Sequence, residues 1–263
     1  MRIGVHARLT AESIDVGPLA RAAEELGFES LFVPEHTHMT ASFVATNPDR
    51  AEWAAWAGAL LDPFVALATA AAVTDRILLG TGVCLVPQHH PITLAKQVAT
   101  LDQLSGGRFL FGVGAGWVEE EMRDHGVTRS RRFRLLRESL LAMQAIWASE
   151  EASFDGDLVK FSGVRQGPKP LQTPHPPILV GGERGRALAI AHEVGGEWFP
   201  HADADLGEGS GLRVTIFGAE PDRDALARYA DAGVERCVLI LPSTKTHDVG
   251  GELERLATVA GLG

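Results

Sequence analysis

Two glycine-rich apolar runs stand close together near the middle of the chain, ILLGTGVCL over residues 77–85 and RFLFGVGAGW over residues 108–117. Neither run has a helical period, so both are typical of short strands buried on both faces. A helix is predicted between them by an apolar stripe at helical spacing, a starting proline and closing glycines: Leu94, Val98, Leu101, Pro91, Gly106 and Gly107. The pattern predicts a strand, a helix and a second strand parallel to the first.

The same alternation of apolar strand and amphipathic helix continues along the chain. Further strands are predicted over residues 2–7, 30–36, 176–182, 197–200, 213–219 and 237–242. Helices are predicted between them, for example from Asp62 to about Thr74 and from about Arg131 to Ser149. Eight strands alternating with helices over 263 residues predict an α/β fold, the (β/α)8 TIM barrel, as a single domain over residues 1–263. A doubly wound open sheet is the alternative.

Three segments depart from the repeat. Residues 201–212 are too short and too rich in glycine for an ordinary crossover helix, so we expect a degenerate or missing sixth helix. Residues 37–61 form a long insertion after strand two, which places them on the catalytic face of a barrel. Residues 150–177 form a second insertion, before strand five, with a predicted hairpin about Asp155 and Gly156.

Composition narrows the possible partners and location. The formal net charge is -10, which argues against nucleic-acid binding because nucleic-acid binders carry a basic surface. No apolar run is long enough to span a bilayer, and no signal-peptide pattern precedes the first strand, so we expect no membrane partner and a cytoplasmic protein. Cys84 and Cys237 lie inside apolar runs and are predicted to be buried free thiols.

Glycines gather where two predicted neighbouring strands end, at positions 80, 82, 112, 114 and 116. Glycine weakens a strand unless the backbone bends there or another group approaches it closely. Ligands of α/β folds bind at the carboxyl ends of the strands. We therefore interpret these glycines as a ligand site, with tight packing at a barrel corner as the alternative.

Several ordered motifs then suggest a family. The chain contains GTGVCLVPQHHPITLAKQVATLDQLSGGRFLFGVGAGW, then EEEMRDHGV, then PKPLQTPHPPILVGG. Together they resemble the luciferase-like monooxygenase superfamily, and within it the members that use the deazaflavin coenzyme F420. The resemblance spans nearly the whole chain. It implies a (β/α)8 barrel, a flavin or deazaflavin across the carboxyl ends of the strands, and a homodimer.

The resemblance also implies roles for individual residues. A cis peptide bond is expected between Gly82 and Val83, although the second residue is not proline. This bond would back the central ring of the cofactor. The end of strand four is expected to lie along the cofactor through Gly114, Ala115, Gly116 and Trp117. The end of strand five is expected to meet the cofactor phosphate through Gly181, Gly182 and Glu183. Physical chemistry supports this last role independently, since a helix N-terminus preceded by glycines attracts anions.

Catalytic and substrate-binding residues are implied at the same face. His36 matches a position where deazaflavin enzymes of the family often keep a histidine beside the reacting ring, and Glu35 precedes it. An imidazole can donate a hydrogen bond or a proton there, with an ordinary pKa of about 6.5. Trp117 stands where some relatives carry a catalytic glutamate, which disfavours a sugar-phosphate substrate. With Trp53 and Trp56 of the first insertion, it predicts an aromatic wall for the substrate, although the latter two could simply anchor the loop.

We therefore expect an oxidoreductase that transfers a hydride between coenzyme F420 and a small organic substrate. An FMN-dependent monooxygenase of the same superfamily is the first alternative. A metal-dependent barrel hydrolase is the second, because His36 and His38 form an HxH pair that His201 and Asp203 could complete. A protein that holds the cofactor without turnover is the third.

Overall fold

The computed structural model describes residues 1–206, 211–242, 244 and 249–262. Eight parallel strands in this part of the chain form one sheet in the order β8-β7-β4-β3-β2-β1-β10-β9. The strands are β1 Arg2–His6, β2 Ser30–Val33, β3 Leu78–Thr81, β4 Phe109–Val113, β7 Ile178–Gly181, β8 Glu197–Phe199, β9 Thr215–Ala219 and β10 Arg236–Ile240. All eight predicted strands are present, although β2 and β3 end before the positions predicted for them.

The two outer strands of this order meet and nearly close the sheet into a barrel. Single bridges join Trp198 to Val214 and His201 to Phe217, in place of a continuous ladder between β8 and β9. This closure excludes the doubly wound open sheet and confirms the barrel. No helix lies between β8 and β9 among the described residues 200–206 and 211–214, as predicted for a missing sixth helix; residues 207–210 of that segment lie outside the described residues.

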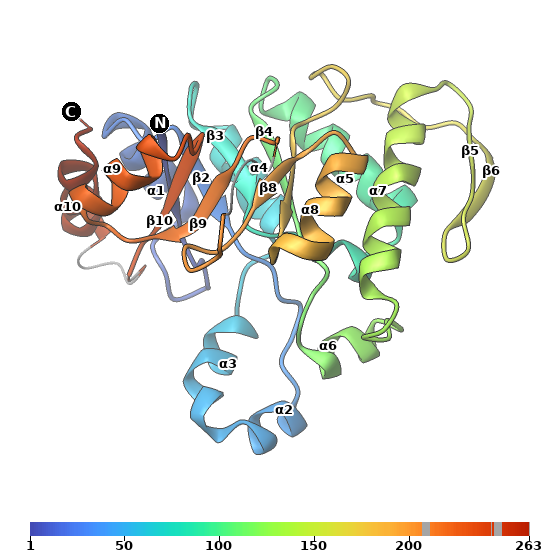
Figure 1. Ribbon diagram of the computed structural model, residues 1–263, viewed down its shortest axis with the longest axis horizontal. Helices are drawn as coiled ribbons and strands as arrows, with labels where there is room; N and C mark the ends of the chain where they lie inside the picture. The colour runs from blue at the N-terminus through green and yellow to red at the C-terminus, as the bar shows by residue number, and fades with distance from the viewer. Residues whose placement is uncertain (207–210, 243, 245–248, 263) are drawn as a thin grey trace.

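Helices cover the outside of the barrel (Figure 1). They are α1 Val16–Glu25, α4 Pro63–Ala71, α5 Pro91–Leu104, α7 Arg132–Ala148, α8 Arg184–Glu193, α9 Arg223–Asp231 and α10 Val249–Ala260. Local chemistry fixes several of their starts. Asp62 caps α4 by accepting the N–H of Val65, and Asp222 caps α9 by accepting the N–H of Ala225, both at 2.9 Å.

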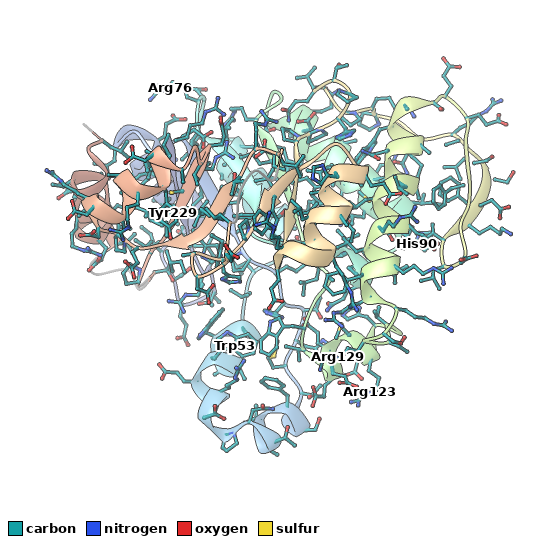
Figure 2. The ribbon with its side chains drawn as sticks, viewed as in Figure 1. Trp53, Arg76, His90, Arg123, Arg129 and Tyr229 are labelled. Atoms are coloured by element: carbon teal, nitrogen blue, oxygen red, sulfur yellow. The ribbon has the colours of Figure 1, made fainter. Side chains whose placement is uncertain are left out.

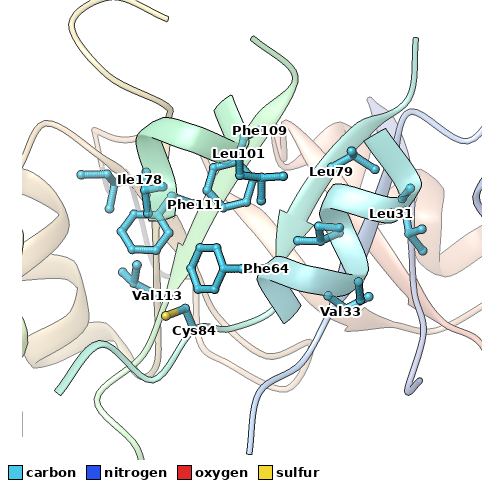
Figure 3. Close-up of a cluster of buried hydrophobic side chains, with 14 of the residues drawn as sticks. Leu31, Val33, Phe64, Leu79, Cys84, Leu101, Phe109, Phe111, Val113 and Ile178 are labelled. Atoms are coloured by element: carbon cyan, nitrogen blue, oxygen red, sulfur yellow. The ribbon is translucent and has the colours of Figure 1, made fainter. Parts of the chain in front are cut away.

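The core has two parts. The larger part fills the space between strands and helices, and Figure 3 shows it where α4 and α5 pack on the sheet through Phe64, Leu101 and Phe109. The smaller part fills the barrel interior with Phe32, Leu110, Leu179, Phe199 and Val238. Because neighbouring residues of each strand point alternately outward and inward, the uninterrupted apolar runs serve both parts.

A buried ion network closes the amino-terminal end of the barrel interior. Arg236 is 2% exposed and donates to both carboxylate oxygens of Glu29 at 2.7 and 2.6 Å. It also donates to Thr215 at 3.1 Å and lies 3.7 Å from the carboxylate of Glu197. Burial alone lowers the pKa of Arg236, but its hydrogen bond to Glu29 and the neighbouring carboxylates outweigh burial and raise it. The network therefore keeps this guanidinium charged inside the barrel.

The first insertion is helical and stands at one end of the barrel. It contains α2 Ala41–Thr46, the short helix η1 Pro48–Arg50 and α3 Ala51–Ala57, none of which the sequence pattern predicted. A further short helix, α6 Glu119–Asp124, follows β4 at the same end (Figure 1). These helices gather around the carboxyl ends of the strands, the face that the sequence assigned to ligand binding.

The second insertion lies outside α7. Its strands, β5 Ala152–Asp155 and β6 Lys160–Val164, form the predicted antiparallel hairpin around Gly156. The carboxylate of Glu138 on α7 accepts the N–H groups of Leu158 and Val159 at 2.7 and 3.0 Å, which ties the hairpin tip to that helix. This hairpin stands apart from α2 and α3 (Figure 1).

Candidate functional site

The segment after β3 shapes the floor of the site. The Gly82-Val83 peptide is cis, as the family resemblance implied. A Cβ atom at Gly114 would lie 2.6 Å from Cγ2 of Val83, and one at Gly181 would lie 3.2 Å from its Cγ1. These two glycines therefore make room for the Val83 side chain. Tight packing, the alternative to a ligand site, thus accounts for Gly114, and Val83 remains partly exposed at the mouth of the barrel.

Replacing Gly114 with alanine is expected to lower the free energy of unfolding by about 1–3 kcal/mol, because the added methyl group displaces Val83 in a closely packed site. Denaturant unfolding measures the change. Gly185→Ala is the matched control, since a Cβ there meets no atom within 4 Å and the residue lies in α8. Equal stability of the two variants would contradict this account of Gly114.

His36 and Glu121 form a polar pair at the same face. Nδ1 of His36, just after β2, lies 2.8 Å from Oε2 of Glu121 on α6. The Thr37 N–H donates to the other oxygen of Glu121 at 2.8 Å. Burial acts to raise the pKa of Glu121, but the hydrogen bond and charge of His36 outweigh it, and the pKa is lowered. The carboxylate therefore stays charged and orients the imidazole, whose Nε2 hydrogen-bonds to no other described residue.

Aromatic side chains surround this histidine. The ring of Trp53 packs edge-on to His36 with centroids 5.2 Å apart, and Trp117 stands 6.5 Å from it. Trp53 also contacts Trp117 at 4.9 Å and Trp56 at 5.6 Å. The three predicted tryptophans thus meet in one wall, although they come from an insertion and from the end of β4. Trp117 is 44% exposed and leaves a large apolar surface beside His36.

Glu35 turns away from this wall and holds the segment after β3. One of its oxygens accepts the N–H of Leu85 at 2.5 Å, and the other lies 2.8 Å from Nε2 of His89. Both oxygens are thereby occupied, and the residue is 5% exposed. Burial and the nearby Glu35 raise the pKa of the Cys84 thiol well above its ordinary range. We therefore propose that Glu35 positions the Val83 segment, in place of the catalytic role expected from the sequence.

The ion pair between His89 and Glu35 gives stability a pH dependence. Burial lowers the pKa of His89, but the hydrogen bond and charge of Glu35 and the charge of Asp62 outweigh burial and raise it above 6.5. A raised folded-state pKa stabilises the fold fully below the unfolded pKa of about 6.5, and this contribution is lost as the pH rises through the folded value. As the pH rises across this range, the free energy of unfolding of the wild type should fall relative to that of His89→Asn. If the difference in free energy of unfolding between the two proteins did not change with pH, the ion pair would not contribute to stability.

A second histidine lies deeper in the barrel. His6 ends β1, is 4% exposed, and packs edge-on against Phe217 with centroids 4.9 Å apart. Burial lowers its pKa to about 3, so the ring is neutral at physiological pH. Neither ring nitrogen has a hydrogen-bond partner of good geometry among the described residues. The sequence reasoning did not single out His6 or Glu121; a glutamate in a run of three beside Met122 gives little indication that it is buried.

The end of β7 leads directly into a helix N-terminus. Gly182 has a positive φ of 123°, and Glu183 takes the N-cap position of α8 without a side-chain hydrogen bond to the helix. Glu183 therefore does not cap α8 as Asp62 caps α4 and Asp222 caps α9. Such an end favours a phosphate or carboxylate.

The HxH pair of the hydrolase alternative does not converge on one point. His36 turns to Glu121, whereas His38 pairs with Asp124 at 3.2 Å. His201 stacks edge-on against Phe217. Within the described ranges, three potential metal ligands come within 4.8 Å of one another only at Glu35, Cys84 and His89. The arrangement gives no support to a metal-dependent hydrolase built on His36 and His38.

Comparison with known families agrees with this geometry. The model of the luciferase-like monooxygenase family matches residues 4–233. The chain belongs to the luciferase-like monooxygenase family. The protein is therefore an enzyme of an oxidoreductase and monooxygenase family that includes F420-dependent and FMN-dependent members.

Relatives of this luciferase-like chain use different cofactors. Uncharacterized protein Rv0953c of Mycobacterium tuberculosis is 41% identical over 257 residues, which cover 90% of this chain and 91% of that protein. An FMNH(2)-dependent dimethylsulfone monooxygenase of Pseudomonas putida is 33% identical over 71% of this chain and 48% of that protein. An F420-dependent hydroxymycolic acid dehydrogenase of M. tuberculosis is 28% identical over 81% of this chain and 61% of that protein.

Solved structures share the fold of this luciferase-like chain at low identity. Monooxygenase RslO1 from Streptomyces bottropensis has a TM-score of 0.79 at 20% identity, covering 98% of this chain and 97% of that one. An F420-dependent secondary alcohol dehydrogenase has a TM-score of 0.75 at 16% identity, again covering 98% and 97%. Within the described residues, no helix combines the length and the apolarity that crossing a bilayer requires.

Proposed function

We propose that the protein transfers a hydride between coenzyme F420 and a small organic substrate at the carboxyl ends of its barrel strands. The observation that carries this proposal is the His36–Glu121 pair, held among Trp53 and Trp117 at the same end of the barrel as the partly exposed Val83. It combines a group that can hold or move a proton with an apolar wall. Hydride transfer to or from an organic substrate requires both, because the hydride moves in a dry site while a proton compensates the charge.

The residues present suit a deazaflavin or flavin ring. Val83 offers a partly exposed apolar side chain, and the Trp117 side chain lies at the same face. The N-terminus of α8, preceded by Gly181 and Gly182 and not capped by the Glu183 side chain, suits the phosphate. When bound, the coenzyme supplies the two-electron chemistry.

The roles of the chain's own residues follow from their contacts. Glu121 accepts a hydrogen bond at Nδ1 of His36, which fixes the ring and leaves Nε2 to donate or accept a proton at the substrate. Trp53, Trp56 and Trp117 exclude water and orient an apolar or aromatic substrate. Glu35 holds Leu85 and His89, and so keeps Val83 in place.

An FMN-dependent monooxygenase is the second candidate. The dimethylsulfone monooxygenase of P. putida supports it with 33% identity, against 28% for the F420-dependent dehydrogenase, although the latter spans more of this chain. The same strand ends and the same helix N-terminus suit either ring. The position of His36 favours the deazaflavin, because the F420-dependent members that the sequence resembles often keep a histidine there, whereas proton transfer by the pair would suit either cofactor.

A parallel titration of the purified protein with oxidised F420 and with FMN, followed by fluorescence, tests the proposal. Tight binding of F420 with weak or no binding of FMN is the expected result, and a substrate screen with the reduced coenzyme would follow. Tight binding of FMN alone would assign the protein to the flavin monooxygenases. Binding of neither would overturn both candidates.

A further inference from the structure

Arginines gather beside the proposed site, at the start of α7 and in the first turn of α8. The group, here called the arginine cluster, consists of Arg129, Arg131, Arg132 and Arg186. Figure 2 shows Arg129 at the same end of the molecule as Trp53, whereas Arg76 lies at the opposite end. This local concentration of positive charge lies in a chain whose formal net charge is -10.

The charges of this cluster are poorly neutralised by the protein itself. Arg132 donates to the backbone carbonyl of Arg129 at 2.8 Å, and its Nε is buried without a hydrogen-bond partner among the described residues. Burial and the positive charges of Arg129 and Arg186 lower its pKa. Arg129 pairs with Glu119 at 3.8 Å, but both side chains are more than half exposed. Neither Arg132 nor Arg186 forms an ion pair with a carboxylate of the described residues.

One aromatic ring brings two of these arginines together. The guanidinium of Arg132 lies 4.7 Å from the ring centroid of Phe133, and that of Arg186 lies 5.3 Å from the same centroid. Stacking on Phe133 orients both groups while leaving their N–H donors available. Two like charges held on one ring repel each other, so an anion between or beside them is stabilising.

A surface groove continues from this point. It has a volume of about 250 Å³, runs between α7 and α8, and is lined by Phe133, Arg186, Arg137 and Ile190 among others. Arg137 in this groove is already engaged by Glu193, so Arg186 is the lining arginine without such a partner among the described residues. The groove thus begins at the arginine cluster and runs along α7 and α8, away from the N-terminus of α8.

We propose that the arginine cluster binds the acidic oligoglutamate tail of the deazaflavin coenzyme, beyond the phosphate. This inference rests on the proposed function. A tail of several carboxylates matches several unneutralised guanidinium groups, each able to bind a carboxylate through two N–H donors. FMN ends at its phosphate and has no group to place there. The cluster therefore selects the deazaflavin coenzyme over the flavin.

The test compares four ligands by fluorescence titration at low and moderate salt: F420 with a long tail, F420 with a short tail, FMN, and the deazaflavin chromophore that lacks phosphate and tail. In the wild type, affinity should rise with tail length, and the gain should shrink as salt is added. Arg132→Gln/Arg186→Gln should reduce the affinity for long-tailed F420 about tenfold and leave that for the tailless chromophore unchanged. Arg76→Gln, at the far end of the barrel, controls for net charge and should change neither.

The outcomes separate the two proposals. Tail-independent affinity in the wild type, or an unchanged tail dependence in the double variant, overturns the role of the cluster while binding of the tailless chromophore still supports the site. Binding of neither F420 nor the chromophore overturns the proposed function and this inference together. Because the chromophore contacts only the cleft, its unchanged affinity also shows that the double variant is folded.

Discussion

Replacing His36 with alanine is expected to reduce kcat about 100- to 10,000-fold, the range typical for loss of a general acid or base. In the proposed function, Nε2 of this imidazole exchanges a proton with the substrate, while Glu121 fixes Nδ1. The affinity for the coenzyme should change little, because His36 is not among the residues proposed to bind the coenzyme phosphate. Steady-state kinetics with the reduced coenzyme, together with a binding titration, measure both quantities.

Glu121→Gln is the companion variant, since it keeps the size of the side chain and removes its charge. A loss of about 10- to 100-fold is expected, as for other residues that orient a reacting group. If His36→Ala retained wild-type turnover, proton transfer through this residue would be excluded. If Glu121→Gln had no effect on kcat, the imidazole would not need the carboxylate for its orientation.

Replacing Arg236 with alanine is expected to lower the free energy of unfolding by about 3–5 kcal/mol. The residue is almost fully buried and neutralises Glu29 and Glu197 at the amino-terminal end of the barrel. Its removal takes the buried arginine from Glu29 and leaves Glu197, itself 4% exposed, with only Arg213 at 2.8 Å as a charged partner among the described residues. Urea unfolding monitored by tryptophan fluorescence measures the change, with catalysis as a second readout that should remain intact in the folded fraction.

Arg2→Ala serves as its control, because it removes a second arginine from the same Glu29. Arg2 lies 3.6 Å from that carboxylate but its side chain is 52% exposed, so a loss of at most about 1 kcal/mol is expected. Similar losses for the two variants would show that burial does not control the strength of this network.

The fold was largely predictable because burial on both faces leaves a simple pattern in the sequence. The runs that became β3 and β4 are mostly apolar and contain glycines toward their ends, and the helix between them carries one apolar stripe. The small helices α2, α3 and α6 were not predicted. They are six or seven residues long, too short for a helical period to emerge from the sequence.

The site was predictable only in part. His36 and the tryptophans were named from the resemblance, and the structure brings them together. Glu121 could not be found in the same way, because its pairing with His36 spans 85 positions and depends on how α6 folds back over the barrel. The sequence indicated that the glycines have a structural or binding role. Only the structure shows that Gly114 makes room for the Val83 side chain.

The bridges between β8 and β9 have a consequence for native-state fluctuations. Because few backbone hydrogen bonds cross this seam, amides such as those of Trp198 and Phe217 should exchange with solvent before those linking β1 to β2 and β10. Such local opening converts the closed cylinder into a curved sheet with two free edges. Water then reaches the interior phenylalanines sideways, through the wall of the barrel, without passing the mouth at the carboxyl ends of the strands.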